Sequence, residues 1–218
     1  MSGQIKICGI SQEAHAEAVA ESGADFIGFV FAESRRRIEP WTARICIERA
    51  KAINPGIRAV GLFVKATIED IHAIRDEAGF DLAQIHGLPS AEWLEQLAIP
   101  VWVTARVEPG SPVKPIEAGF IDASESGYVE ALLLDTYHPT LAGGTGMLGD
   151  WDAARDFANR HPVILAGGLS PDNVGKAIVQ VRPHGVDVST GVESDGIKDP
   201  ALIAAFVRNA RGAFAALD

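Results

Sequence analysis

Cysteine and basic side chains are both scarce in this chain of 218 residues. Cys8 and Cys46 are its two cysteines, too few and too far apart for a disulfide framework or a zinc site. The histidines lack metal-ligand spacing, so no metal is expected. The formal net charge of −10, from 19 Lys+Arg against 29 Asp+Glu, disfavours binding to nucleic acid or an anionic membrane.

Long apolar runs are lacking as well. None approaches the roughly 20 residues that a membrane-spanning helix needs, and the N-terminus MSGQIKIC lacks a basic-then-apolar signal pattern. We therefore expect a cytoplasmic protein. No low-complexity linker divides the chain, and its length suits one domain, so we expect residues 1–218 to form a single domain.

Short apolar runs alternate with amphipathic stretches along the whole chain, which is typical of repeated βα units. Strands are predicted at residues 5–10, 25–31, 58–64, 82–86, 101–107, 131–136, 163–167 and 185–189. Helix-start signals lie at Pro40, Thr67, Ser90 and Asp199. In the Pro- and Gly-rich stretch 108–130, only a short helix over residues 113–118 is expected. Eight units predict an α/β protein with a closed (β/α)8 barrel, although an open doubly wound sheet fits the same alternation.

Two glycine-rich loops follow the last two predicted strands. The segment AGGLSPDNV at 166–174 places glycines before Ser170 and Pro171, which we expect to be the N-cap and first residue of a helix. The segment VSTG at 188–191 ends a strand in small hydroxyl residues and glycine. Backbone N–H groups in such loops can point at an anion, so a phosphorylated small molecule is expected as ligand. The predicted phosphate-binding residues are Gly167, Gly168, Ser189 and Thr190.

Polar side chains stand at the ends of the other predicted strands. In a barrel, the βα loops at the carboxyl ends of the strands line one mouth, where the chemistry takes place. A possible base, an acid and several cations would therefore meet the phosphate loops there. These residues are Cys8, Arg35, Arg36, Arg37, Gln84, His86, Arg106 and Asp135.

Several of these segments together resemble one family. They are KICGI at 6–10, SRRRIEP at 34–40, LLLDT at 132–136 followed by GGTG at 143–146, and GVDVSTGVE at 185–193. The chain resembles phosphoribosylanthranilate isomerase, the tryptophan-pathway enzyme that catalyses an Amadori rearrangement. The resemblance implies a (β/α)8 barrel and a cofactor-free isomerisation of N-(5'-phosphoribosyl)anthranilate to 1-(2-carboxyphenylamino)-1-deoxyribulose 5-phosphate.

The family's catalytic residues match two positions of this chain. The resemblance implies that Asp135 is the general acid that opens the ribose ring and that Cys8 is the general base that removes the C2 proton. A thiol with an ordinary pKa of about 8.5 is a weak base at neutral pH, so we expect the site to lower the pKa of Cys8. Lys6 is the candidate for this effect, because it shares the strand face of Cys8 at a distance of roughly 7 Å.

The family binds the anthranilate carboxylate with an arginine, which alignment on Pro40 identifies as Arg36. The usual Ser-Pro-Arg reads Ser-Arg-Arg here, so Arg35 or Arg37 could take this role. The resemblance adds Gly144 to the phosphate-binding residues. Other possible substrate contacts are Lys6, Gln84, His86, Arg106 and Asp187.

Several candidates also have a purely structural explanation. Cys8 could be a small buried apolar residue, as Cys46 is expected to be. His86 could satisfy a backbone carbonyl, Arg106 could pair with a neighbouring carboxylate, and Asp187 could hold a loop.

Two other functions compete with the isomerase. The related isomerase of histidine biosynthesis uses an aspartate at the end of strand one, and Cys8 at that place argues against it. A barrel kept only for binding is the second alternative, against which Cys8 and Asp135 both argue. A monomer and a homodimer are both compatible with the sequence.

Overall fold

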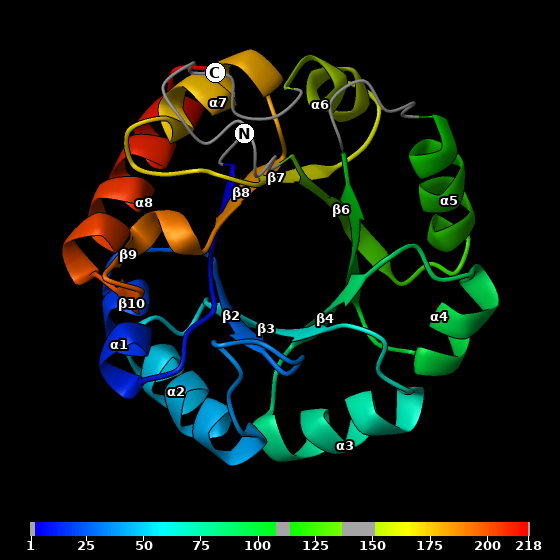
Figure 1. Ribbon diagram of the computed structural model, residues 1–218, viewed down its shortest axis with the longest axis horizontal. Helices are drawn as coiled ribbons and strands as arrows, with labels where there is room; N and C mark the ends of the chain where they lie inside the picture. The colour runs from blue at the N-terminus through cyan, green and yellow to red at the C-terminus, as the bar shows by residue number, and fades with distance from the viewer. Residues whose placement is uncertain (1–2, 108–113, 137–150, 218) are drawn as a thin grey trace.

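The structure is a computed structural model that describes residues 3–107, 114–136 and 151–217. Eight parallel strands close into a barrel in chain order, and the helices form a ring around it (Figure 1). This confirms the closed barrel over the open sheet. The strands are β1 (Gln4–Cys8), β2 (Phe26–Val30), β3 (Arg58–Phe63), β4 (Leu82–His86), β5 (Val101–Arg106), β6 (Val129–Asp135), β7 (Val163–Ala166) and β8 (Gly185–Val188).

The helices begin where local signals favour them. Thr67 caps α3 in a reciprocal box with Asp70, and the Ser90 side chain accepts the N–H of Trp93 at the start of α4. Asp199 accepts the first N–H groups of α8. The helices are α1 (Glu13–Glu21), α2 (Pro40–Ile53), α3 (Ile68–Ala78), α4 (Ala91–Leu97), α5 (Lys114–Ser124), α6 (Trp151–Ala158), α7 (Val174–Val181) and α8 (Pro200–Ala215).

The helix after β7 starts later than the sequence predicts. Ser170 as N-cap and Pro171 as first helical residue are wrong, because α7 begins at Val174 with Asn173 at its N-cap. The Asn173 side chain accepts the N–H of Ser170 at 2.8 Å and donates to the carbonyl of Gly168 at 2.9 Å. These two bonds stabilise a turn that closes the glycine loop in place of a first helical turn.

Two further elements differ from the prediction. Helix α5 continues past the expected end at residue 118 to Ser124. A short 3-10 helix (Thr190–Val192) follows β8 and leads into a small antiparallel hairpin of β9 (Glu193–Ser194) and β10 (Ile197–Lys198). None of the described helices is both long and apolar enough to cross a membrane.

Apolar side chains fill both sides of the barrel wall. The larger cluster packs the outer face of the strands against the helices. Inside, the rings of Phe26 and Trp102 lie 4.6 Å apart, and polar residues follow them toward the carboxyl ends of the strands. The inner cluster is Phe26, Val60, Leu82, Trp102, Ala131, Leu133, Ile164 and Ala166.

Candidate active site

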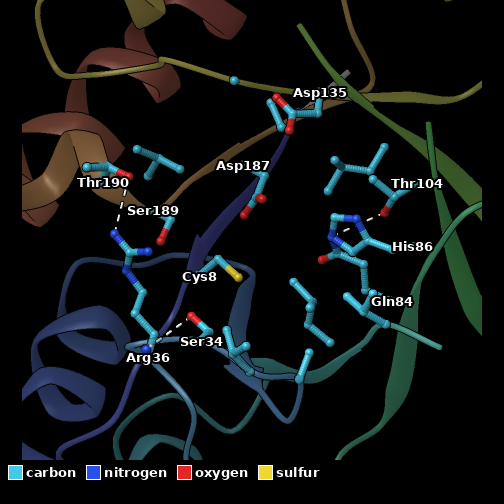
Figure 2. A pocket seen from close by; sticks show the side chains of 18 of the residues that line it. Cys8, Ser34, Arg36, Gln84, His86, Thr104, Asp135, Asp187, Ser189 and Thr190 are labelled. Atoms are coloured by element: carbon cyan, nitrogen blue, oxygen red, sulfur yellow. Dashed lines mark hydrogen bonds between the residues drawn. The ribbon is translucent and has the colours of Figure 1, made fainter. Parts of the chain in front are cut away.

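A cavity of about 470 Å³ opens at the carboxyl ends of the strands. Figure 2 shows side chains from β1, β4, β5, β6 and β8, and from the loop after β2, arranged around it. Most of the residues singled out from the sequence meet here. Those that line the cavity are Cys8, Arg36, Gln84, His86, Asp135, Gly167, Gly168, Asp187, Ser189 and Thr190.

A buried chain of polar side chains crosses the barrel at the floor of the cavity. The Lys6 ammonium, at 0% exposure, donates to Asp187 Oδ1 at 2.9 Å and to Gln84 Oε1 at 2.9 Å. The Gln84 Nε2 group donates in turn to Thr104 Oγ1 at 3.2 Å. These contacts join β8, β1, β4 and β5, so the cavity floor is held by satisfied polar groups and one buried ion pair.

Cys8 lies on β1 two residues beyond Lys6 and on the same face. Burial raises the pKa of the Cys8 thiol, although the Lys6 charge opposes this effect and Asp187 reinforces it. The expectation that the site lowers this pKa is therefore wrong, because the effect of desolvation outweighs that of the Lys6 charge. Gly28 on β2 makes room for both side chains, since a Cβ there would lie 2.9 Å from Cys8 Sγ and 3.0 Å from Lys6 Cε.

Asp135 stands at the end of β6, across the cavity from Cys8 in Figure 2. In the strand register Asp135 pairs with Arg106 of β5 and with Ala166 of β7, which places it between the carboxyl ends of these two strands. His86 lines the same cavity at the end of β4. The cavity walls partly desolvate the His86 ring, which lowers its pKa and favours the neutral imidazole, which can donate or accept a hydrogen bond.

The two glycine-rich loops contact each other through their backbones. Gly191 lies against the carbonyl of Leu169, so closely that a Cβ at residue 191 would overlap the Leu169 oxygen. Gly167 and Gly168 both have a positive φ, of 96° and 66°. Glycine is therefore required on both sides of the contact, which brings the loops after β7 and β8 to one edge of the cavity.

Arg36 lines the cavity, whereas Arg35 and Arg37, which the structure also describes, do not. The Arg36 guanidinium donates to both oxygens of Glu193, from Nε at 2.7 Å and from Nη2 at 2.9 Å. Nη2 also donates to Thr190 Oγ1 at 3.3 Å, and a dashed line marks this bond in Figure 2. The guanidinium is thus held in one orientation beside the loop after β8.

Comparisons with known proteins agree with this geometry. Residues 5–209 match the family model described as N-(5'phosphoribosyl)anthranilate (PRA) isomerase. The chain belongs to this family. An N-(5'-phosphoribosyl)anthranilate isomerase of Desulforudis audaxviator is 43% identical over 96% of this chain and 98% of its own.

Solved structures of phosphoribosyl anthranilate isomerases have the same fold. The Thermotoga maritima enzyme covers 96% of this chain and 99% of its own at 36% identity, with a TM-score of 0.80. A complex with reduced 1-(o-carboxyphenylamino)-1-deoxyribulose 5-phosphate covers the same shares at 35% identity, with a TM-score of 0.78. The predicted isomerase of tryptophan biosynthesis is therefore confirmed at the level of the family.

Two other residues singled out from the sequence, Lys6 and Arg106, do not line this cavity. Lys6 is fully buried below the cavity and does not line it. Arg106 lies in a neighbouring hollow that it shares with His86 and Asp135. Gly144 falls outside the described residues.

Two charged residues next to Arg36 in this isomerase are not revealed by the sequence patterns. Glu193 and Lys198 form an ion pair at 2.8 Å on the β9–β10 hairpin, next to Arg36. Glu193 belongs to the VDVSTGVE motif, but nothing in the spacing of the motif shows which cations it contacts. In the described part of the chain, no group of three or more His, Cys, Asp or Glu side chains is arranged to hold a metal ion.

Proposed function

We propose that Cys8 and Asp135 perform the Amadori rearrangement of N-(5'-phosphoribosyl)anthranilate in the cavity at the carboxyl ends of the strands. The observation that carries this proposal is that both side chains line one cavity that also contains Arg36 and the two glycine-rich loops. The loops would bind the phosphate, and Arg36 would bind the anthranilate carboxylate through its remaining N–H groups.

The reaction needs an acid and a base on the same bound sugar. Asp135 donates a proton to the ring oxygen as the C1–O bond breaks, which leaves a cationic Schiff base between C1 and the anthranilate nitrogen. Cys8 then removes the C2 proton, and the electrons neutralise the nitrogen to give an enolamine. Loss of the enol proton and protonation at C1 complete the isomerisation with no net change in protons.

The raised pKa of Cys8 constrains when the thiolate forms. Burial disfavours the charged form of the thiol and raises its pKa, so the thiol keeps its proton until a further positive charge offsets this effect. The Schiff base brings a positive charge next to the sulfur, and this charge adds to that of Lys6 in favouring the thiolate. The base would then form only after ring opening, which orders the two proton transfers.

Two substitutions test the assignment, each with a matched control. Cys8→Ala and Asp135→Asn should each lower kcat by at least about 100-fold, which is the usual range for losing a positioned acid or base. The controls are Cys46→Ala, which alters a buried cysteine of α2, and Asp122→Asn, which alters an exposed carboxylate of α5. Continuous loss of substrate fluorescence, with the substrate made in place from anthranilate and phosphoribosyl pyrophosphate, measures the activity. Activity within tenfold of the unmodified protein in either site variant refutes that residue's role.

Four further expectations stay predictions. They are a single domain over residues 1–218, a cytoplasmic location, a monomeric or homodimeric state, and no nucleic-acid partner. Analytical ultracentrifugation of the purified protein decides between the two oligomeric states.

A further inference from the structure

Glu193 is a nearly buried carboxylate surrounded by three cations. Its side chain is 4% exposed and accepts bonds from Arg36, from Lys198 at 2.8 Å and from Arg35 Nη2 at 2.7 Å. Burial alone would raise the pKa of Glu193, but hydrogen bonds from Arg36 and Lys198 outweigh it and lower the pKa to about 2. The carboxylate therefore stays ionised at any pH at which the protein works.

Arg36 connects Glu193 to the cavity. Its side chain is 21% exposed and crosses the backbone of Gly9, where a Cβ would lie 2.6 Å from Arg36 Cδ. Because Glu193 takes the Nε–Nη2 edge of the guanidinium, the Nη1 side is left for an anionic ligand. The position of Glu193 thus decides which donors Arg36 presents to the cavity.

Lys198 connects Glu193 to the loop after β8. The Lys198 side chain is 3% exposed, does not line the cavity, and donates to Glu193 and to the Ser189 carbonyl, both at 2.8 Å. Its ammonium also lies 3.3 Å from Ser189 Oγ. Lys198 therefore fixes the turn at Ser189, whose backbone continues into the contact between Gly191 and the loop after β7.

The geometry points to Glu193 as a positioning residue that sets both anion-binding ends of the cavity. We propose that this one carboxylate fixes the Arg36 guanidinium directly and the Ser189 turn through Lys198, so that the two ends stay in register for a ligand that carries a phosphate and a carboxylate. The inference rests on the proposed function for the identity of that ligand. According to this inference, the β9–β10 hairpin contributes to substrate affinity although it lies outside the barrel.

The charge of the cluster supports this assignment. Arg36 and Lys198, whose side chains are largely buried, bring two positive charges to the one negative charge on Glu193, whereas the charge of Arg35 is exposed and screened by solvent. A local excess of positive charge therefore stands beside the cavity in a chain whose net charge is −10. Without Glu193 the cations would repel one another and, among the described residues, the Arg36 side chain would keep only its 3.3 Å bond to Thr190, so a larger positive charge would not give tighter binding.

Glu193→Gln tests the inference, because glutamine keeps the shape but turns an N–H group toward a cation. Two probes that need no turnover measure the effect by calorimetry: inorganic phosphate, and reduced 1-(o-carboxyphenylamino)-1-deoxyribulose 5-phosphate. We expect both to bind at least about tenfold more weakly, and KM to rise with kcat changed less than threefold. Glu193→Asp, which keeps the charge on a shorter stem, should recover part of the affinity.

Arg35→Ala is the matched control. It removes another partner of Glu193, but one whose side chain is 56% exposed and does not line the cavity, so both probes should bind within twofold of the unmodified protein. If Glu193→Gln is folded by circular dichroism and binds both probes within twofold, the inference is wrong. If it lowers kcat and leaves both affinities unchanged, the carboxylate acts on the chemistry, which also overturns the inference. Because the phosphate probe needs no isomerase activity, failure of the proposed function would not affect this result.

Discussion

The variant Lys6→Met should lower the free energy of unfolding, because it breaks the buried ion pair of Lys6 and Asp187. Methionine has a similar length and keeps the packing, but it removes the ammonium that bonds Asp187 and Gln84 at 2.9 Å each. The Asp187 carboxylate and the Gln84 oxygen then lose this partner at the cavity floor. Breaking a buried pair in this way costs about 3–5 kcal/mol of the free energy of unfolding.

The position of Asp187 narrows the expected loss of the free energy of unfolding. Asp187 lines the cavity, so solvent reaches its carboxylate and lowers the cost toward about 3 kcal/mol. The double variant Lys6→Met/Asp187→Asn removes both charges and should lose only about 1 kcal/mol, chiefly for the unpaired Gln84 oxygen. The double variant should therefore be more stable than Lys6→Met alone.

Urea unfolding followed by circular dichroism measures both free energies from the midpoint and the slope. Cys46→Ala, a substitution in the outer core, provides a comparison with an ordinary loss of buried volume. A loss below about 1 kcal/mol for Lys6→Met, or a double variant at least as unstable as the single one, would refute the reasoning that charge pairing holds the cavity floor.

Three more predictions follow from the site. Because burial raises the pKa of the Cys8 thiol, its alkylation by iodoacetamide should be slow at pH 7 and should accelerate only as pH rises beyond the ordinary thiol range; full reactivity at neutral pH would contradict this. The pKa of Glu193 falls from 4.5 to about 2 on folding, so its stabilising effect is complete above about pH 4.5 and is lost as pH falls toward 2. The stability difference between the unmodified protein and Glu193→Gln, measured by urea unfolding, should shrink over that interval, and a constant difference counts against the ion pairs. Gly191→Ala should weaken phosphate binding and destabilise the fold, because its Cβ would overlap the Leu169 carbonyl, whereas Gly212→Ala in α8, with open space around it, should be neutral or stabilising by up to about 1 kcal/mol in the same assays.

The barrel could be predicted from sequence because its strands are buried on both faces and appear as continuous apolar runs. The start of β6 shows where this signal ends. The strand begins at Val129, before its predicted start at residue 131, and Glu130 interrupts the apolar run. Glu130 is held by two bonds of 2.8 Å from Arg58, a partner 72 residues away that no local pattern reveals.

In the candidate site, too, local patterns predict some features and long-range contacts determine the others. Cys8 and Asp135 could be found because polar residues at the ends of apolar strands must meet at one mouth of a barrel. Lys6 shares a face with Cys8 by simple alternation, but its partner Asp187 lies 181 residues along the chain. The net effect on the Cys8 thiol depends on burial, which strand periodicity does not give, and so the sign of its pKa shift was wrong.

The contacts of Glu193 lie beyond sequence reasoning for a different reason. Its bonds to Arg36 span 157 residues and depend on a hairpin with two-residue strands, too short to leave a periodic signal.

Ser170 illustrates an error in predicting local structure. The dipeptide Ser-Pro is typical of a helix start, but α7 begins only at Val174, after a turn in which the Asn173 side chain accepts the Ser170 N–H and donates to the Gly168 carbonyl.

Trapping of the Schiff base tests the central claim most directly, because it separates the work of the acid from that of the base. Sodium cyanoborohydride reduces an open Schiff base at C1 to a secondary amine, which mass spectrometry detects during a single turnover. In Cys8→Ala, Asp135 still opens the ring and the intermediate cannot proceed, so the trapped amine should accumulate well above the level without protein. In Asp135→Asn the ring stays closed and the amine should remain at that background level. Equal trapping in the two variants, or trapping in Asp135→Asn alone, would contradict the assignment of Asp135 as acid and Cys8 as base.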